Sequence, residues 1–167
     1  GIQMTKVRIL LITIILSVCM VGTIFAATSS DNHDVTLDVQ EVVLIGLNDA
    51  TAITLTTTEP ANAGADPTGE TDSSKALFYT SLVGSGTRSI TAALGGNSAP
   101  NGTSLLLEAT SVPSGCGTAQ GQITLSGTAQ NLVTGIGSCA TGTGSSDATP
   151  LTYTFSVDDV SSMSVGD

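Results

Sequence analysis

The 167-residue chain carries fourteen acidic side chains, four basic ones and a single histidine, which gives a formal net charge of −10. Such a polyanion repels phosphate backbones and anionic lipids, so the charge argues against binding to nucleic acid or to a lipid surface. Thr and Ser make up close to a third of the residues after position 26, and aromatic residues amount to only 3%. This composition favours β-structure over helix.

The N-terminus has the pattern of an export signal. Lys6 and Arg8 precede an almost wholly apolar stretch at 9–25, which ends at two alanines before the chain turns polar. This order predicts a secretory signal peptide over residues 1–26, with residues 1–3 upstream of the true start at Met4. Cleavage after Ala27, a retained membrane anchor, and lipidation at Cys19 stay open as alternatives.

Cleavage of the signal would change the N-terminus and the net charge of the exported protein. A polar leader at 27–33 would come first, and Lys75 and Arg88 would be left against all fourteen acidic residues, a net charge of −12. We therefore expect an extracellular protein of the bacterial cell surface. It would meet a membrane only transiently, during export.

The first strand is predicted at 34–45. Val35, Leu37 and Val39 alternate with polar residues, which is the period of a half-buried strand, and the apolar series continues through Val43 and Ile45. A strand that directly follows a short leader can complete the sheet of a neighbouring molecule. It can equally pair within its own domain, and the two arrangements have the same sequence pattern.

Short strands separated by turn residues follow at intervals typical of an antiparallel sandwich. They are expected at 52–58, 76–83, 88–94, 104–110, 121–125, 129–134 and 151–157. The spacing predicts two hairpins, one joining 76–83 to 88–94 and one joining 121–125 to 129–134. With strand 34–45, this makes a single all-β domain at 34–160, an immunoglobulin-like or jelly-roll-like sandwich of about eight strands, followed by a polar tail at 161–167.

Two cysteines remain after the signal. Cys116 and Cys139 form an even pair in a chain that is expected to pass through an oxidising compartment, and we predict a disulfide between them. It would close a loop of roughly 20 residues, worth ~3 kcal/mol in the chain-entropy model. Two buried thiols are the alternative.

Residues that could carry chemistry are few. The only histidine, His33, lies in the polar leader, and neither a nucleophile elbow nor a phosphate-binding loop occurs, so we expect no enzyme, no catalytic residue and no cofactor. Asp66, Glu70 and Asp72 are weak candidates for a Ca²⁺ site, with a solvated acidic loop as the simpler interpretation.

One glycosylation sequon occurs after the signal. Asn101 begins the sequence Asn-Gly-Thr in a predicted turn, where an N-linked glycan would fit. Sugars on the abundant Thr and Ser hydroxyls are the alternative decoration.

Several stretches together resemble the fimbrial and pilus subunits of Gram-negative bacteria. The resemblance covers about 34–157 and follows the order of signal, alternating first strand and Thr/Ser-rich strands. It is carried by 78–81 (FYTS), 88–92 (RSITA), 135–142 (GIGSCATG) and 151–157 (LTYTFSV). It implies a β-sandwich that polymerises by strand donation. Chaperone–usher pilins place their disulfide early in the domain, whereas Cys116 and Cys139 lie late.

The expected function is therefore that of a structural subunit of an extracellular filament. Its partners would be copies of itself, joined head to tail through Val35, Leu37, Val39, Val43 and Ile45, with surface glycans as a second candidate partner. A monomeric adhesin or binding domain, and a surface-layer or matrix component, are the alternative functions.

Overall fold

The structure is a computed structural model that describes residues 35–164. The signal, the leader, His33 and residues 165–167 lie outside this range. Residues 35–38 belong to one unit of the chain, and residues 39–164 belong to a second, so each is described by itself. Strands and one short 3-10 turn are the regular elements of the described residues, and the predicted all-β class is confirmed.

The larger sheet contains five strands in its main path, all antiparallel, in the order β1-β5-β12-β7-β9. Their bounds are β1 (Val42–Leu47), β5 (Ala76–Leu82), β12 (Thr149–Val157), β7 (Thr103–Ala109) and β9 (Gln122–Thr124). Two short strands, β4 (Thr71–Asp72) and β11 (Cys139–Ala140), extend the pairing of β12 and β5. In this sheet β1 is an edge strand.

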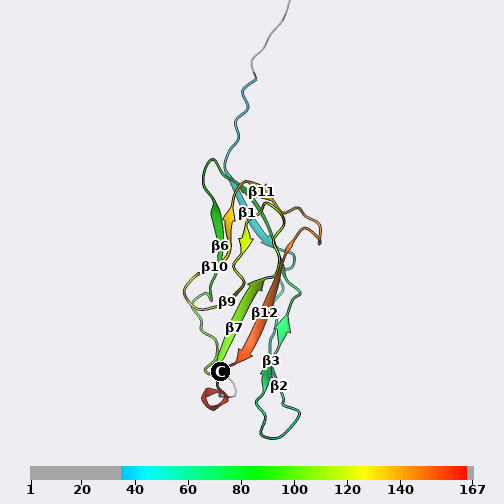
Figure 1. Cartoon of the computed structure of the whole chain (residues 1–167), viewed down its shortest axis with the longest axis vertical. Coiled ribbons are helices and arrows are strands. Elements are labelled where there is room, and N and C mark those ends of the chain that lie inside the picture. Colours follow the sequence, from blue (N-terminus) through cyan, green and yellow to red (C-terminus); the bar gives the residue numbers. More distant parts are fainter. Residues whose placement is uncertain (1–34, 165–167) are drawn as a thin grey trace, which may run out of the picture. The chain divides into compact units, whose positions relative to one another are not determined.

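The smaller sheet has three strands in the order β6-β10-β8, with bounds β6 (Arg88–Ala92), β10 (Gln130–Ile136) and β8 (Thr118–Ala119). A separate ribbon pairs β2 (Thr57–Thr58) with β3 (Thr68–Gly69), and η1 (Val160–Ser162) follows the last strand. The two sheets pack as the layers of the predicted sandwich (Figure 1).

The pair β7 and β12 shows why the chain forms strands here. Side chains alternate across a strand, and β12 places Leu151, Tyr153 and Phe155 on one face and threonines on the other. Tyr153 lies opposite Leu107 and Phe155 opposite Leu105, so the apolar residues of both strands share the inner face. Figure 1 shows the two strands side by side.

The core lies between the sheets and is built mostly of aliphatic residues. Its buried members are Leu77, Tyr79, Leu107, Ala109, Cys116, Leu125, Leu132, Val133, Ile136 and Leu151. Both layers contribute: β5, β7 and β12 from one, and β10 from the other. Phe78, which neighbours Tyr79, is only half-buried because successive strand residues point to opposite faces.

Both predicted hairpins are wrong. β5 pairs with β1 and β12, whereas β6 pairs with β10, so the chain crosses from one sheet to the other at 83–87. Similarly, β9 pairs with β7, and β10 pairs with β6 and β8. Gly86 adopts a φ of +74° in the first connection, which a residue with a side chain rarely does. The inner residues of successive strands therefore meet across the core instead of side by side.

Another prediction needs correction at the start of the domain. The strand expected at 52–58 shrinks to β2, although Ile53 and Leu55 are half-buried as their alternation predicted. Residues 49–56 leave the sheet after β1, so their backbone has no ladder to join.

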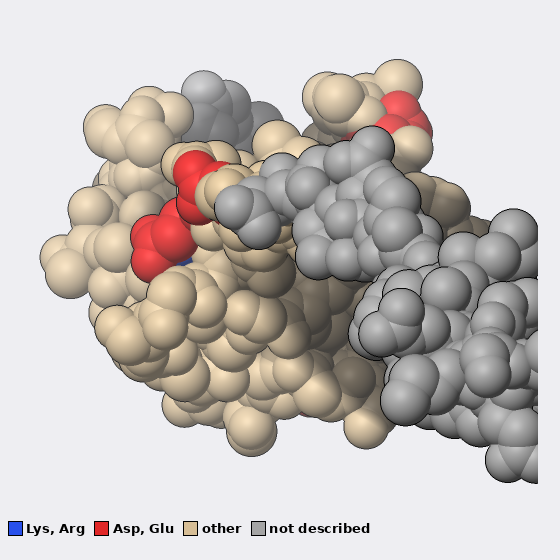
Figure 2. All heavy atoms as spheres, turned by 90° about the horizontal axis from the view of Figure 1, so that it is seen from above, with Lys and Arg blue, Asp and Glu red and all other residues tan. Residues whose placement is uncertain are grey.

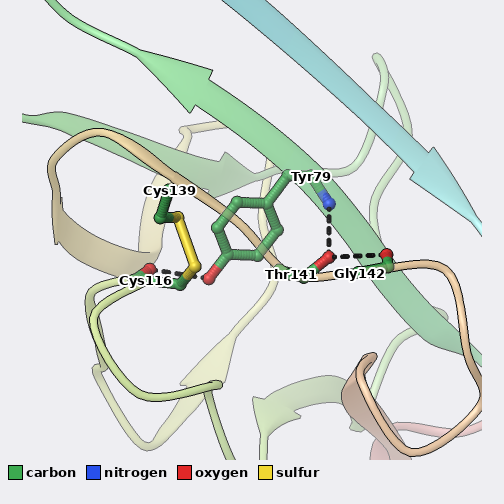
Figure 3. Close-up of a disulfide and its surroundings, with 5 residues drawn as sticks. All are labelled: Tyr79, Cys116, Cys139, Thr141 and Gly142. Carbon is green, nitrogen blue, oxygen red and sulfur yellow. Dashed lines mark hydrogen bonds between the residues drawn. A yellow bond between two sulfur atoms is a disulfide. The ribbon is translucent and has the colours of Figure 1, made fainter.

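The predicted disulfide between Cys116 and Cys139 is confirmed. Cys116 is almost fully buried, and the Tyr79 hydroxyl donates a hydrogen bond of 2.8 Å to its carbonyl oxygen. Figure 3 shows the Tyr79 ring between the disulfide and Thr141, whose hydroxyl accepts a hydrogen bond from the Tyr79 backbone N–H. Burial raises the pKa of the Tyr79 hydroxyl. The bridge thus ties the loop before β8 to β11 and to the centre of β5.

We expect replacement of both cysteines by alanine to lower the free energy of unfolding by about 3 kcal/mol, because the unfolded chain regains the freedom of the opened loop. Equilibrium urea unfolding of the oxidised protein and of the double variant measures the loss. Single replacements would leave an unpaired thiol, so the double variant is the cleaner comparison. Equal midpoints and slopes for the two proteins would show that the bridge does not stabilise the fold.

Candidate assembly site

The apolar residues of β1 face the core side of the larger sheet and yet lie open. In the antiparallel register Val43 lies opposite Ser81, Ile45 opposite Tyr79 and Leu47 opposite Leu77. Those three β5 partners are buried, so Val43, Ile45 and Leu47 point to the same inner face. Nevertheless they are 63%, 60% and 47% exposed. Leu44, on the other face, is also exposed, so β1 is apolar and open on both sides.

The residues before β1 make the strand predicted at 34–45 wrong in its bounds. The strand begins at Val42 and ends at Leu47, and residues 35–41 carry no strand pairing. Val35, Leu37 and Val39 are 67%, 85% and 75% exposed. An extended segment becomes a strand only when its backbone pairs with that of a neighbouring strand, and residues 35–41 have no such ladder. The register of β1 with β5 is intramolecular.

A groove runs along the uncovered inner face. Val43 and Ile45 of β1 form one wall with Tyr79 and Ser81 of β5, and the opposite wall includes Ile90 of β6. Its volume is about 460 Å³. The groove exists because the smaller sheet is only three strands wide and ends at β6, so within residues 39–164 no further strand covers β1.

Glu41 fixes the point at which the chain enters β1. Its carboxylate accepts a hydrogen bond of 2.9 Å from the Gly84 backbone N–H and one of 3.1 Å from the Arg88 guanidinium. Both ionic partners are partly solvated, so the pair contributes little energy and serves mainly to position the chain. The start of β1 is thereby held against the start of β6.

A second anchor follows β1. Lys75 lies directly before β5 and is only 5% exposed. Its ammonium group donates hydrogen bonds to the Asp49 carboxylate at 2.9 Å and to the Thr51 hydroxyl at 3.1 Å. A buried cation is costly without partners, so this contact holds 49–51 over the inner face of the sheet. The Thr51 hydroxyl first, then the Thr51 backbone N–H and Lys75, hold the pKa of the Asp49 carboxyl far below its usual range.

Beside this anchor lies a second apolar cavity of about 500 Å³. Ile53 and Leu55 close it from the segment after β1, and Leu105 and Phe155 form its floor on β7 and β12. The cavity is thus lined by the segment after β1 together with the inner face of the larger sheet.

The other residues singled out in the sequence do not converge on a site. Asp66, Glu70 and Asp72 form no metal-binding group, and none is found among residues 35–164. The Glu70 carboxylate instead accepts from the Thr56 backbone N–H, and the Asp72 carboxylate accepts from Ser74. The acidic loop uses these carboxylates to hold its own backbone.

Asn101 lies in an exposed turn directly before β7, as the sequence predicted. Its attachment to a glycan stays a prediction. On the face seen in Figure 2, acidic side chains lie at separate places and most of the surface is uncharged.

Sequence reasoning missed the polar residues of the site, namely Glu41, Asp49, Lys75, Ser81 and Arg88. One signal was available, because Lys75 and Arg88 are the only basic residues after position 8. Each borders or begins a strand, where a charge is unusual unless it has a partner. Their acidic partners lie 26 and 47 positions earlier in the chain, and no local pattern reveals such pairs.

The described fold defines the chain as an antiparallel β-sandwich protein with one disulfide. Comparisons with family models, with curated proteins and with solved structures gave no match. Within residues 35–164, no helix is long and apolar enough to cross a membrane.

The Asp49 anchor predicts a stability that falls in acid. Because the fold lowers the pKa of this carboxyl, the folded state takes up the proton at lower pH than the unfolded chain does. Its contribution is complete above about pH 4 and is lost as the pH falls further. We expect the melting temperature of the wild type to exceed that of Asp49→Asn at pH 6 and the two to converge towards pH 2. Melting curves that stay parallel across this range would contradict the anchor.

Because the apolar side chains of β1 are exposed, truncating one of them should cost the monomer much less stability than truncating a buried core residue. Ile45→Ala should cost the monomer less than about 1 kcal/mol, because the side chain is already mostly in water. Ile136→Ala, at a fully buried position, should cost about 2–5 kcal/mol. Urea unfolding at a dilution that keeps the protein monomeric gives both values. Similar losses for the two variants would mean that β1 is covered in the monomer.

Proposed function

We propose that this protein is a structural subunit of an extracellular bacterial filament, polymerised head to tail by donation of its N-terminal segment. The observation that carries the proposal is the exposure of Val35, Leu37 and Val39 in a segment that carries the alternation of a strand without pairing as one. Exposed alternating apolar residues fit the open sheet or groove of another molecule. Soluble monomers rarely leave such an apolar series uncovered.

The incomplete sandwich supports the same function from the receiving side. The inner residues of β1 remain open because the smaller sheet ends at β6. One molecule then has a segment to give and an uncovered face to fill. Contacts between unlike surfaces continue from copy to copy and produce a fibre unless a rotation closes them into a ring.

The energetics favour such an exchange. Each of the three donated side chains would contribute roughly 1.5–3 kcal/mol on burial, before the entropic cost of association is subtracted. Backbone hydrogen bonds along an added strand satisfy groups that would otherwise stay open at a sheet edge. The disulfide suits an oxidising, extracellular setting.

The test removes the donated side chains and leaves the backbone intact. We expect the triple variant Val35→Ser, Leu37→Ser and Val39→Ser to stay monomeric at concentrations at which the wild type polymerises. Sedimentation velocity and negative-stain microscopy provide the readouts. The matched control keeps the same three positions apolar, as Val35→Ile, Leu37→Ile and Val39→Ile, and should polymerise as the wild type does.

Each result has a distinct meaning. Polymers of the triple variant would rule out strand donation by this segment. A wild-type protein that remains a monodisperse monomer at every concentration would rule out the filament and favour a monomeric surface binding domain. Flat sheets or networks in the micrographs would favour a surface-layer component instead.

A further inference from the structure

We infer that the groove between β1 and β6 is the acceptor site, and that its occupant is segment Val35–Val39 of a second copy of this chain, added as a strand along the free edge of β6. The inference rests on the proposed function and specifies which surface receives the segment. Two edges compete for this role, the outer edge of β1 and the outer edge of β6. Four observations favour β6.

The first observation is the shape and chemistry of the groove. A strand beside β6 would lie over Val43 and Ile45 and would cover inner-facing side chains that are now about 60% exposed. The volume of about 460 Å³ lies within the roughly 300–1,000 Å³ usual for ligand-binding clefts. A strand added at the outer edge of β1 would widen the larger sheet and leave this inner face in water.

The second observation concerns buried polar atoms. Ser81 Oγ and Arg88 Nε are buried and have no hydrogen-bond partner among the described residues, and both residues line the groove. Ser81 is only 3% exposed. An unsatisfied buried group costs about 1–3 kcal/mol. A carbonyl or carboxylate oxygen of an incoming segment can accept from the Arg88 Nε–H at the edge of β6, whereas a purely apolar ligand would leave this donor unpaired.

The third observation is charge. Arg88 begins β6 and is one of the two basic residues in the described part of the chain; the other, Lys75, is buried against Asp49. The segment offered by a second copy contains Asp38 and no basic residue. Arg88 already pairs with Glu41 of its own chain through one guanidinium nitrogen, but its Nε–H has no partner among the described residues, so it can still attract a carboxylate to the end of the groove at which β6 begins.

The fourth observation concerns which molecule supplies the segment that fills the groove, a second copy or the chain itself. Glu41 is bonded to Gly84 and Arg88, so β1 starts at the same end of the groove as β6. To fill its own groove, the chain would have to reverse within Gln40 and Glu41, and neither is a residue that favours a tight turn. A segment from another molecule meets no such constraint.

Cysteine cross-linking tests the docking place directly. On a strand, Thr36 alternates with the apolar residues, and Ser89 is exposed beside Ile90 on β6. We expect the double variant Thr36→Cys and Ser89→Cys to give a covalent ladder of multimers on a non-reducing denaturing gel after mild oxidation. The comparison variant, Thr36→Cys and Gly46→Cys, samples the face of β1 that points away from the groove, where a side chain at position 46 meets open space, and should give at least tenfold less cross-linked product.

A complementation experiment does not depend on added cysteines. Ile45→Asp places a charge on the groove wall and should block acceptance, while Gly46→Asp adds the same charge to the other face of β1 and should polymerise normally. Mixing the donor-deficient triple serine variant with Ile45→Asp should yield only 1:1 dimers, because one intact donor and one intact acceptor remain. Sedimentation velocity identifies the dimer.

The outcomes separate the acceptor from the function. Wild-type polymers, together with a ladder through Gly46 and none through Ser89, would overturn the groove and leave the filament intact. Normal polymerisation of Ile45→Asp would overturn it as well. If the wild type forms no polymer at all, the filament itself fails, and the acceptor inference fails with it.

Discussion

The unequal width of the two layers is the constraint on which the rest of this structure depends. The larger sheet continues past the core to β1, but the smaller sheet ends at β6. The central strands bury their inner residues between both layers, whereas Val43 and Ile45 remain about 60% exposed. The groove, its unsatisfied polar atoms and the exposed apolar edge all follow from this one mismatch.

The covered part of the fold is held by contacts that are far apart in sequence. The disulfide fastens the loop before β8 to β11, and the Tyr79 hydroxyl joins β5 to the same loop. Lys75 and Asp49 secure the chain after β1, and Glu41 secures it before β1. An edge strand with two open faces is thus kept in place from both ends, and its exposed residues remain available to a partner.

The strong negative charge matters for assembly. Copies of a polyanion repel each other at long range, although physiological salt screens charges beyond about 8 Å. In the proposed filament the attraction must therefore come mainly from short-range apolar contacts and backbone hydrogen bonds. Such a balance keeps free subunits soluble and still permits a specific contact.

By itself, the sequence determined the all-β class, the paired cysteines and the inner residues of the clearest strand, because alternation and composition act locally. It gave no means of assigning strand partners: the turn after β5 suits a hairpin, yet the chain crosses to the other sheet. It also predicted one strand at 34–45, where the structure pairs only Val42 onwards. Tertiary structure alone decided these points, since pairing and burial depend on which distant residues supply the opposite edge or face.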